Sequence, residues 1–546
     1  MIRSMTRNQR LIFDSLLLGV VGALSAQLFM FLLSGSQHFF LGWLAAYRPP
    51  GLPEEGGVLI EFFGPHGRWL IPLSTTLGGL ISGILVFSVA PEAEGHGTDT
   101  AVKAYHRSAG YLRPRVPFIK MIASAITIGS GGSAGREGPT ALISAGIGSI
   151  YASVFNRSEQ DRRTIVLIGM AAGLSAIFRS PIGCAVFAVE VLYRDMEFES
   201  GALFYAMLAS IVAYVLNAAF VGWQPLFQIP PGLAITEISD YVWYVFLGIA
   251  AGIIATVLPS IFYGFRDCFK RIPVADIFKP AIGGLLLGVL ALFLPQVLGG
   301  GYGWIQEAIS GKLSNYLLLA LVFGKILSFS FTVSSGGSGG IFAPCLFVGA
   351  MLGGFMADLL GQPCAPFVVI GLVAVFGAAA RVPFATLLMV AEMTGGYQLL
   401  VPAATALSVS LAIQIMLTRS LTYKSLYEGQ VPGRADSPAH HAEHIKIAIN
   451  LLRNGQVPSS LTGERLNLLG LLGKGIELDL GEGQKLDIIE LSDGDPCLGD
   501  SFRSVCMLKK LQTTENIAMI RQGKLYLPDT EEILQEGDRV LALVSV

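Results

Sequence analysis

Long apolar stretches separated by short polar segments make up most of the first 425 residues of the chain. Several reach the roughly 20 residues that a helix needs to cross a bilayer, namely 11–33, 69–90, 241–262, 280–299 and 399–418. Others, at 116–128, 140–155, 164–177, 182–193 and 384–393, are only about 10 to 16 residues long. Helices of that length are tolerated at membrane depth only where protein or a water-filled cavity satisfies their backbone. The pattern therefore predicts an all-α polytopic membrane protein with several broken or re-entrant helices.

The pattern changes after about residue 425. Residues 431–444 form a polar linker that contains RADSPAHHAEH. Beyond it, the sequence predicts a helix at 445–453 and short alternating strands at 485–491, 517–522, 524–528 and 539–546, with turn signals DGD and EGD between strands. We therefore expect a transmembrane domain at 1–430, the linker, and a small cytosolic α/β domain at 445–546.

Composition agrees with this division. The chain is 52% hydrophobic and only 14% charged, against about 25% charged residues in average soluble proteins. A net charge of −2 gives no sign of a nucleic-acid partner. The six cysteines form no CxxC pair and no histidine stands at ligand spacing, so we expect no disulfide framework, metal site or cofactor. Arg3, Arg7 and Arg10 precede the first apolar stretch, which predicts an uncleaved first helix and cytoplasmic termini in a multi-pass inner (plasma) membrane protein.

The membrane part contains an internal repeat. GSGGSAGREGP at 129–139 has a counterpart in SSGGSGGIFAP at 334–344. Each string is followed by a proline–glutamate pair with the same spacing, Pro181 with Glu190 and Pro383 with Glu392. The repeat predicts two inverted halves, about 10–225 and 240–425. Membrane proteins built in this way commonly bind substrate where the interrupted helices of the two halves meet.

Each glycine string predicts a loop that leads into a helix, with the closing proline in the first helical turn. A helix start carries free N–H groups and a partial positive charge, so two starts aimed at one point form an anion site without a cation. Arg136 and Glu137 stand side by side at the first start. Because adjacent helical positions do not face each other, we do not expect them to form a simple ion pair. A carboxylate there is a fixed anion that blocks the site until it is protonated, so Glu137 is predicted to be a gate.

At these residues the sequence resembles the CLC family of chloride channels and chloride/proton antiporters. PEAEGHG (91–97), GREGP (135–139) and GGIFAP (339–344) are similar, in order, to the family's anion-binding motifs, and the resemblance covers about residues 10–427. It implies a CLC-type inverted-repeat fold of about eighteen tilted helices and a homodimer with one pore in each subunit. It also implies transport of chloride or a similar small inorganic anion, with protons as a possible second substrate, and no enzymatic activity.

The resemblance implies roles for individual residues. Glu137 resembles the gating glutamate, and the implied anion-binding residues are His96, Gly97, Arg136, Gly138, Gly340, Ile341, Phe342 and Tyr423. Glu190 and Glu392 resemble carboxylates at helix ends, for which a structural role is favoured over transport. Two positions depart from the family: His96 replaces a pore serine, and Val191 stands where antiporters often carry an internal proton-accepting glutamate.

These departures leave alternatives open. Val191 cannot carry a proton, which favours an uncoupled, channel-like pathway for chloride. The alternative is a proton-coupled antiporter for chloride or another anion such as nitrate or fluoride, in which Glu190 or a water chain replaces the missing relay. His96 keeps the choice of anion open. An intramembrane enzyme is disfavoured because no serine–histidine pair has recognisable spacing, and a cation transporter because nothing resembles a carbonyl-lined filter.

The tail resembles a second module, the TrkA-C domain of potassium transport regulators. DIIELSDGDPCLGDSF (487–502) and ILQEGDRVLALV (533–544) carry this resemblance. It implies dimerisation or regulation by a small ligand, which the sequence does not identify.

Overall fold

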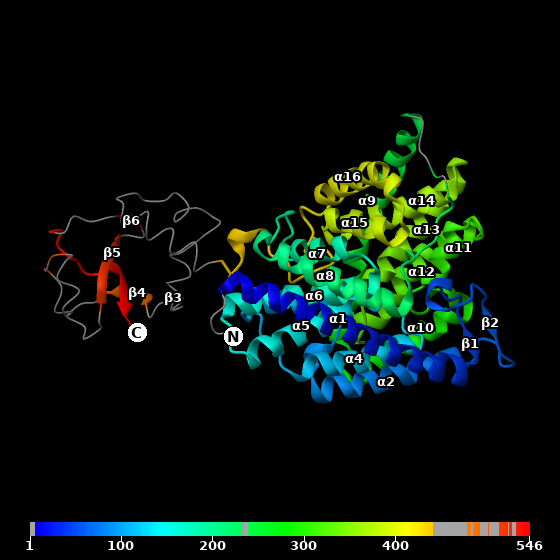
Figure 1. The fold of residues 1–546 in the computed structure, drawn as a ribbon, viewed down its shortest axis with the longest axis horizontal. Coiled ribbons are helices and arrows are strands. Elements are labelled where there is room, and N and C mark those ends of the chain that lie inside the picture. The colour runs from blue at the N-terminus through cyan, green and yellow to red at the C-terminus, as the bar shows by residue number, and fades with distance from the viewer. Residues whose placement is uncertain are drawn as a thin grey trace. The chain divides into compact units, whose positions relative to one another are not determined.

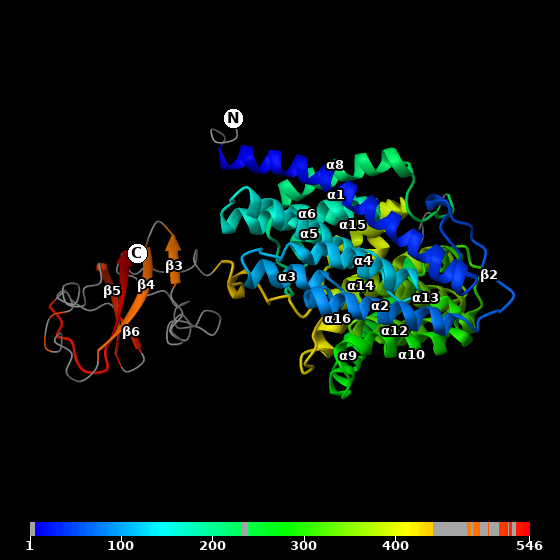
Figure 2. The same cartoon turned by 90° about the horizontal axis from the view of Figure 1, so that it is seen from below.

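The computed structural model describes residues 6–231, 233, 238–440 and, in the tail, 478–481, 484–491, 499, 501, 513–521, 524–526 and 531–545. The chain divides into two compact units between Gln430 and Val431. Within the described residues, the first unit is almost entirely helical and the second contains a β-sheet (Figures 1 and 2).

The helices of the first unit fall into two consecutive sets of eight, one in each half of the repeat. The first half contains α1 (Arg7–Gln37), α2 (Ile71–Val89), α3 (Thr98–Arg107), α4 (Arg115–Gly129), α5 (Glu137–Val154), α6 (Glu159–Phe178), α7 (Pro181–Glu190) and α8 (Ser200–Val221). The second half contains α9 (Ile238–Arg271), α10 (Lys279–Phe293), α11 (Tyr302–Ile309), α12 (Asn315–Ser334), α13 (Phe342–Leu360), α14 (Cys364–Ala380), α15 (Pro383–Thr394) and α16 (Leu400–Leu417). A small ribbon, β1 (Tyr47–Arg48) with β2 (Phe62–Phe63), joins α1 to α2.

Eight helical stretches of the described chain are long and apolar enough to cross a membrane, so the protein is a multi-pass membrane protein. They are Arg7–Leu44, Ile71–Val89, Ser200–Val221, Ile238–Arg271, Asp276–Phe293, Asn315–Ser334, Phe342–Leu360 and Tyr397–Leu417. The short apolar segments predicted from the sequence are the helices α4, α5, α6, α7 and α15. Almost every residue in the second half of α6 is buried, so protein surrounds this helix. The described residues form sixteen α-helices, against the eighteen or so that the resemblance implied.

Local signals place the helix ends at equivalent points of the two halves. Pro181 and Pro383 stand in the first turns of α7 and α15, where a missing N–H costs no hydrogen bond. Arg179 and Arg381 end α6 and α14 in the left-handed conformation, each with φ of 55°. This backbone turn lets the following helix double back, and it is the same in both halves.

A two-fold axis relates the two halves and passes between the glycine strings. Gly135 and Gly340 occupy equivalent positions of the two strings and pair with each other in antiparallel fashion. The N–H of each donates to the carbonyl of the other, and both distances are 2.7 Å. When a residue pairs reciprocally with its own repeat equivalent, the two-fold axis passes between the two residues, which places this axis between Gly135 and Gly340.

Buried polar contacts repeat around the same axis. Lys120 of α4 donates from Nζ to the carbonyls of Ala93 and Gly95, at 3.0 and 2.6 Å. Lys325 of α12 donates to the carbonyls of Val297 and Gly299, at 2.9 and 2.7 Å. Both lysine side chains are fully buried. Each therefore secures the loop that precedes the short helix of its own half, α3 or α11.

The second unit contains a five-stranded antiparallel sheet in the order β3-β4-β7-β5-β6. Its strands are β3 (Leu478–Gly481), β4 (Gln484–Glu490), β5 (Thr513–Arg521), β6 (Lys524–Tyr526) and β7 (Arg539–Ser545). The four strands predicted from alternating apolar residues correspond to β4, β5, β6 and β7. The helix predicted at 445–453 lies outside the described residues.

Candidate functional site

Three helix starts converge where the glycine strings meet. A Cβ atom on Gly138 would lie 2.1 Å from the His96 carbonyl oxygen and 3.0 Å from the Gly340 Cα. A Cβ on Gly97, whose φ is +87°, would lie 2.7 Å from the Gly138 carbonyl oxygen. Side chains at either position would force the backbones apart. The glycines therefore let the first turns of α3, α5 and α13 approach one point.

Glu137 lies at this point, in the first turn of α5, and its side chain is 1% exposed. A Cβ on Gly135 would lie 2.2 Å from Glu137 Oε2 and 3.1 Å from the Ala343 nitrogen, so the carboxylate sits beside the start of α13. Neither carboxylate oxygen has a hydrogen-bond partner in the described chain. The side chain thus occupies a position where the positive ends of two helices face it.

Arg136 is anchored to other side chains. Its guanidinium donates to the carboxylate of Glu55 and lies 4.8 Å from the centre of the Tyr302 ring. Its Nε is 3.7 Å from Glu137 Oε1. As expected, Arg136 and Glu137 form no hydrogen bond with each other. Their side chains nevertheless lie within ion-pair distance, because Arg136 precedes α5 and its long side chain folds back. These contacts border a cavity of about 880 Å³ near the β1–β2 ribbon.

His96 packs among aromatic rings next to the same point. Its ring centre lies 5.6 Å from that of Tyr427 and 6.4 Å from that of Phe262. The side chain is buried, and Nδ1 has no hydrogen-bond partner among the described residues. The backbone of His96 touches α5, as described above, while its ring faces Tyr427.

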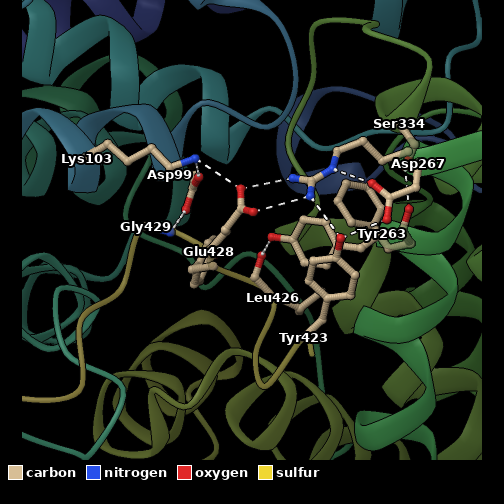
Figure 3. A network of polar contacts seen from close by, with 12 residues as sticks. Asp99, Lys103, Tyr263, Asp267, Ser334, Tyr423, Leu426, Glu428 and Gly429 are labelled. Carbon is tan, nitrogen blue, oxygen red and sulfur yellow. Dashed lines mark hydrogen bonds and ion pairs between the residues drawn. The ribbon is translucent and has the colours of Figure 1, made fainter. Parts of the chain in front are cut away.

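The structure corrects the predicted place of Tyr423. Its ring stacks on Tyr263 at 4.5 Å, and its hydroxyl donates to Asp267 Oδ2 at 2.8 Å (Figure 3). The tyrosine beside the strings is Tyr427, which is 2% exposed and lies next to His96. The chain after α16 follows an irregular path, so spacing alone did not show which tyrosine points inward. A usable signal was that Tyr427 follows an apolar leucine, whereas Tyr423 lies between Thr422 and Lys424.

Tyr427 adds a further aromatic side chain to the site, where its ring lies next to that of His96. Its ring centre is 6.4 Å from that of Phe187 in α7. Phe342 packs on Phe178 and Phe376 at 4.5 and 4.1 Å. The Phe342 ring therefore belongs to an aromatic cluster. Ile341 and Phe342 contribute their backbone atoms to the site.

Glu190 and Glu392 each bind the helix of the opposite half. Glu190, at the end of α7, accepts from the N–H groups of Phe384 and Ala385 at 3.1 and 2.7 Å. Glu392, in α15, accepts from the N–H groups of Ile182 and Gly183 at 3.2 and 2.9 Å, and from a serine hydroxyl. The arrangement indicates that these carboxylates join the halves. Val191 follows Glu190 directly and is fully buried.

The geometry has a counterpart among known protein families. Residues 78–414, more than half of the chain, match the family model described as "Voltage gated chloride channel". The chain belongs to this family. The membership confirms the CLC resemblance of the membrane unit, while the match does not extend to the tail.

Curated relatives in the family include the protein named H(+)/Cl(-) exchange transporter ClcA from Salmonella agona (strain SL483). It is 32% identical to this chain over 381 residues, which cover 66% of this chain and 79% of that protein. The ClcA protein of Salmonella gallinarum (strain 287/91 / NCTC 13346) is similar to the same extent.

Solved structures show the same fold. A CLC-type fluoride/proton antiporter matches with a TM-score of 0.65 at 24% identity, over 78% of this chain and 99% of that chain. A slow cyanobacterial Cl-/H+ antiporter matches with a TM-score of 0.66 at 21% identity, over 77% and 96% of the two chains. The CLC-type arrangement is thus shared by chains of low sequence identity.

Proposed function

We propose that this chain exchanges chloride for protons across a membrane, with Glu137 as the protonatable gate. Support comes from the curated relatives, which are named H(+)/Cl(-) exchange transporters. These relatives favour the coupled alternative over the uncoupled channel that Val191 suggested. The activity needs no covalent chemistry, so we do not assign an enzymatic function.

The observation that carries the proposal is the position of the Glu137 carboxylate. It lies against two helix starts and completes no hydrogen bond with the described chain. An ionised carboxylate is held there by the helix dipoles and competes with an anion for the same place. Protonation removes its charge and weakens this attraction. The side chain can then leave, and a chloride ion takes its place as the proton is carried away.

The anion site proposed here is formed mainly by backbone. Its donors are the N–H groups around Gly97, Gly138, Ile341 and Phe342, joined by the hydroxyl of Tyr427 in place of Tyr423. The N–H of Gly340, which the resemblance included, already donates to the Gly135 carbonyl, so Gly340 contributes close backbone approach and no donor. Arg136 contributes positive potential near Glu137 and is itself held by Glu55. Because glycine leaves the backbone uncovered, an anion can approach these N–H groups closely.

Another small anion, such as nitrate or fluoride, is the second candidate substrate. The observation that favours it is His96, whose Nδ1 is buried beside Tyr427 without a partner in the described chain. A ring nitrogen that carries a proton is a directional donor, unlike a rotating hydroxyl. Efflux measured in turn with chloride, nitrate and fluoride would rank these anions.

The proton route is proposed to be a chain of water molecules. Val191 cannot carry a proton, and both carboxylate oxygens of Glu190 already accept backbone hydrogen bonds from α15. A relay through Glu190 would break those contacts at each cycle. A chain of water molecules that reaches Glu137 past Tyr427 leaves the hydrogen bonds of Glu190 intact.

Transport by the purified protein in sealed liposomes tests the function. With a chloride gradient as the only driving force, we expect chloride efflux together with uphill proton movement. Glu137→Gln should reduce proton movement by about a hundredfold or more, because the neutral amide does not take up and release a proton as a carboxylate does. Chloride efflux should persist without its pH dependence. Glu307→Gln is the matched control, since Glu307 is also a buried carboxylate but pairs with Lys312. Efflux that stays pH-dependent in Glu137→Gln would contradict the gate.

For the assembly, we propose a homodimer in an inner (plasma) membrane with both termini in the cytoplasm. The tail is proposed to be a cytosolic regulatory domain of the TrkA-C kind that binds an unidentified small ligand. A chain ending at Gln430, where the first unit ends, should still carry chloride in liposomes. Loss of transport by a well-folded truncated protein would place the tail in the transport cycle.

A further inference from the structure

The turn that carries Tyr427 has neither helix nor strand, and its backbone is attached at three points. Leu426 donates its N–H to the carbonyl of Ala379 at 2.9 Å, and the hydroxyl of Tyr263 donates to the Leu426 carbonyl at 2.8 Å. Gly429 donates its N–H to the carboxylate of Asp99 (Figure 3). The three partners belong to α14, α9 and α3. The position of Tyr427 therefore depends on contacts made by its neighbours.

Glu428 adds an ionic connection directly next to Tyr427. Its carboxylate lies 3.2 Å from Lys103 Nζ and 3.0 Å from Arg266 Nη1, and a second oxygen accepts from Arg266 Nη2 at 3.3 Å. Lys103 is also 2.7 Å from Asp99, the residue that holds Gly429. Figure 3 shows this row of charges joining α3, α9 and the turn.

The helices joined by Glu428 also form the site. Helix α3 begins at Thr98, directly after His96 and Gly97, and α9 brings Phe262 to the His96 ring. A shift of either helix relative to the turn would move Tyr427 out of its place beside His96.

We propose that Glu428 is a positioning residue that keeps Tyr427 in the anion path through its ion pairs with Lys103 and Arg266. The proposal rests on the proposed role of Tyr427 at one end of the path, but not on proton coupling. When the pairs open, the turn loses its ionic connection to α3 and α9. Tyr427 can then withdraw, which admits water and anions from that end.

The exposure of these groups suits a connection that opens and closes. The side chains of Glu428, Lys103 and Arg266 are 42%, 40% and 22% exposed. Ion pairs at a solvent boundary contribute little to overall stability and are screened by salt. Their loss is therefore expected to free the turn without unfolding the protein.

The connection is expected to persist at acidic pH. Burial acts to raise the pKa of Glu428, but the hydrogen bond and charge of Arg266, with the charge of Lys103, outweigh it and lower the pKa from 4.5 to about 2. The charged groups that face Glu428 are Arg266 and Lys103, and Asp99 and Asp267 lie beyond them. Because the pKa is lowered in the folded protein, the contribution of these pairs is complete above pH 4.5 and lost only as the pH falls toward 2. The ion pairs of Glu428 are thus expected to weaken with added salt and to persist at physiologically acidic pH.

Native cysteines provide a test that is independent of transport. Cys345 is fully buried in α13 and lies close enough to Tyr427 to interact with it electrostatically. Cys184 in α7 is equally buried. The rate at which a charged methanethiosulfonate reagent labels each cysteine can be measured by peptide mass spectrometry on the detergent-solubilised protein.

Glu428→Gln should raise the labelling rate of Cys345 by about tenfold, as expected for easier local opening, and leave Cys184 unchanged. Asp276→Asn is the matched control, because Asp276 is 64% exposed and pairs with Lys279 at the start of α10; its Cys345 rate should equal that of the unaltered protein. An unchanged Cys345 rate in Glu428→Gln, or equal increases at Cys184 and Cys345, would overturn the proposal.

A salt series on the unaltered protein keeps the proposal testable if Glu428→Gln fails to fold. Raising sodium gluconate from 0.1 to 1 M shortens the Debye length from about 10 to about 3 Å. Labelling of Cys345 should then rise several-fold, and Lys103→Gln should reduce this dependence. Labelling that does not respond to salt would also overturn the proposal.

Discussion

The two halves of the membrane unit share a scaffold but differ in what they place at its centre. Gly135 and Gly340 pair with each other, and Lys120 and Lys325 hold equivalent loops. Counted back from the closing prolines, however, Glu137 of the first string corresponds to Phe342 of the second. One half thus offers a buried carboxylate, and the other offers a ring packed into an aromatic cluster.

This difference explains how a symmetric scaffold supports a gate. Symmetry aims two helix starts at one place, which favours an anion there regardless of the side chains. A carboxylate in both strings would place like charges together, and a carboxylate in neither would leave the site without one. Under the function proposed above, the single Glu137 makes occupancy of the site depend on protonation.

The largest expected effect is a difference in folding between alanine substitutions at the two paired glycines, Gly340 and Gly135. Gly340→Ala would place its Cβ 2.8 Å from the Gly138 nitrogen and 2.9 Å from the Gly135 carbonyl oxygen, which are backbone atoms that cannot move aside. We expect little or no folded protein in size-exclusion chromatography. A well-folded Gly340→Ala protein with normal thermal stability would show that the strings are not as closely packed as described.

The equivalent change on the other side should behave differently. Gly135→Ala first meets Oε2 of Glu137 at 2.2 Å, at the end of a flexible side chain, and next the Ala343 Cβ at 2.8 Å, whereas both nearest atoms of Gly340→Ala are backbone. The protein should fold with a loss of about 1–3 kcal/mol, and the displaced carboxylate should make chloride efflux faster and less dependent on pH. Equal damage from the two alanines would show that Glu137 adds nothing to the symmetric scaffold.

The buried lysines test whether equivalent contacts have equal energies. Lys120→Met and Lys325→Met each remove the donor from two buried carbonyls, and we expect similar losses of roughly 1–3 kcal/mol in thermal unfolding. Only Lys120→Met should also weaken chloride binding in calorimetry, because the loop it holds continues into His96 and Gly97. Weaker binding in both variants would contradict this assignment.

A smaller effect is expected for the carboxylates that join the halves. Glu190→Gln and Glu392→Gln keep one accepting oxygen each, so each should lose only about 1 kcal/mol of stability. Proton movement driven by a chloride gradient should survive in both. If proton movement disappears in Glu190→Gln alone, Glu190 is the proton relay, and the two carboxylates are not equivalent in function.

The smallest effect concerns a place where the halves differ in sequence. The segment after α16 contains Tyr423 and Tyr427, whereas residues 222–231 after α8 contain no tyrosine. Tyr423→Phe removes the hydrogen bonds of its hydroxyl with Asp267 and Arg266 and should change chloride affinity by less than about twofold. Tyr427→Phe should weaken chloride affinity by about fivefold, within the range expected for one hydrogen bond. The reverse order in calorimetry would restore Tyr423 as the ligand.

Much of the architecture follows from local features of the sequence. Apolar length predicted five of the eight spanning helices and five short ones, because a hydrocarbon environment or a protein interior must bury them along their whole length. The spans Ser200–Val221, Asn315–Ser334 and Phe342–Leu360 were not named from the sequence. The spacing of the two proline–glutamate pairs predicted the repeat, and the buried Glu137 stands in a string whose glycines already indicated a close approach. Strand positions in the tail followed from alternating residues.

Tertiary structure alone decided which distant groups meet. Nothing in the sequence pairs Arg136 with Glu55, Lys120 with the loop before α3, or Glu190 with the start of α15. Between Tyr427 and Tyr423 the sequence offered only the apolar neighbour Leu426 as a signal, since an irregular turn has no period that assigns a face to each residue. Helix formation and burial depend on neighbours along the chain and can be read from it. Partners far apart in sequence depend on how whole helices pack, and here a two-fold packing around Gly135 and Gly340 determines them.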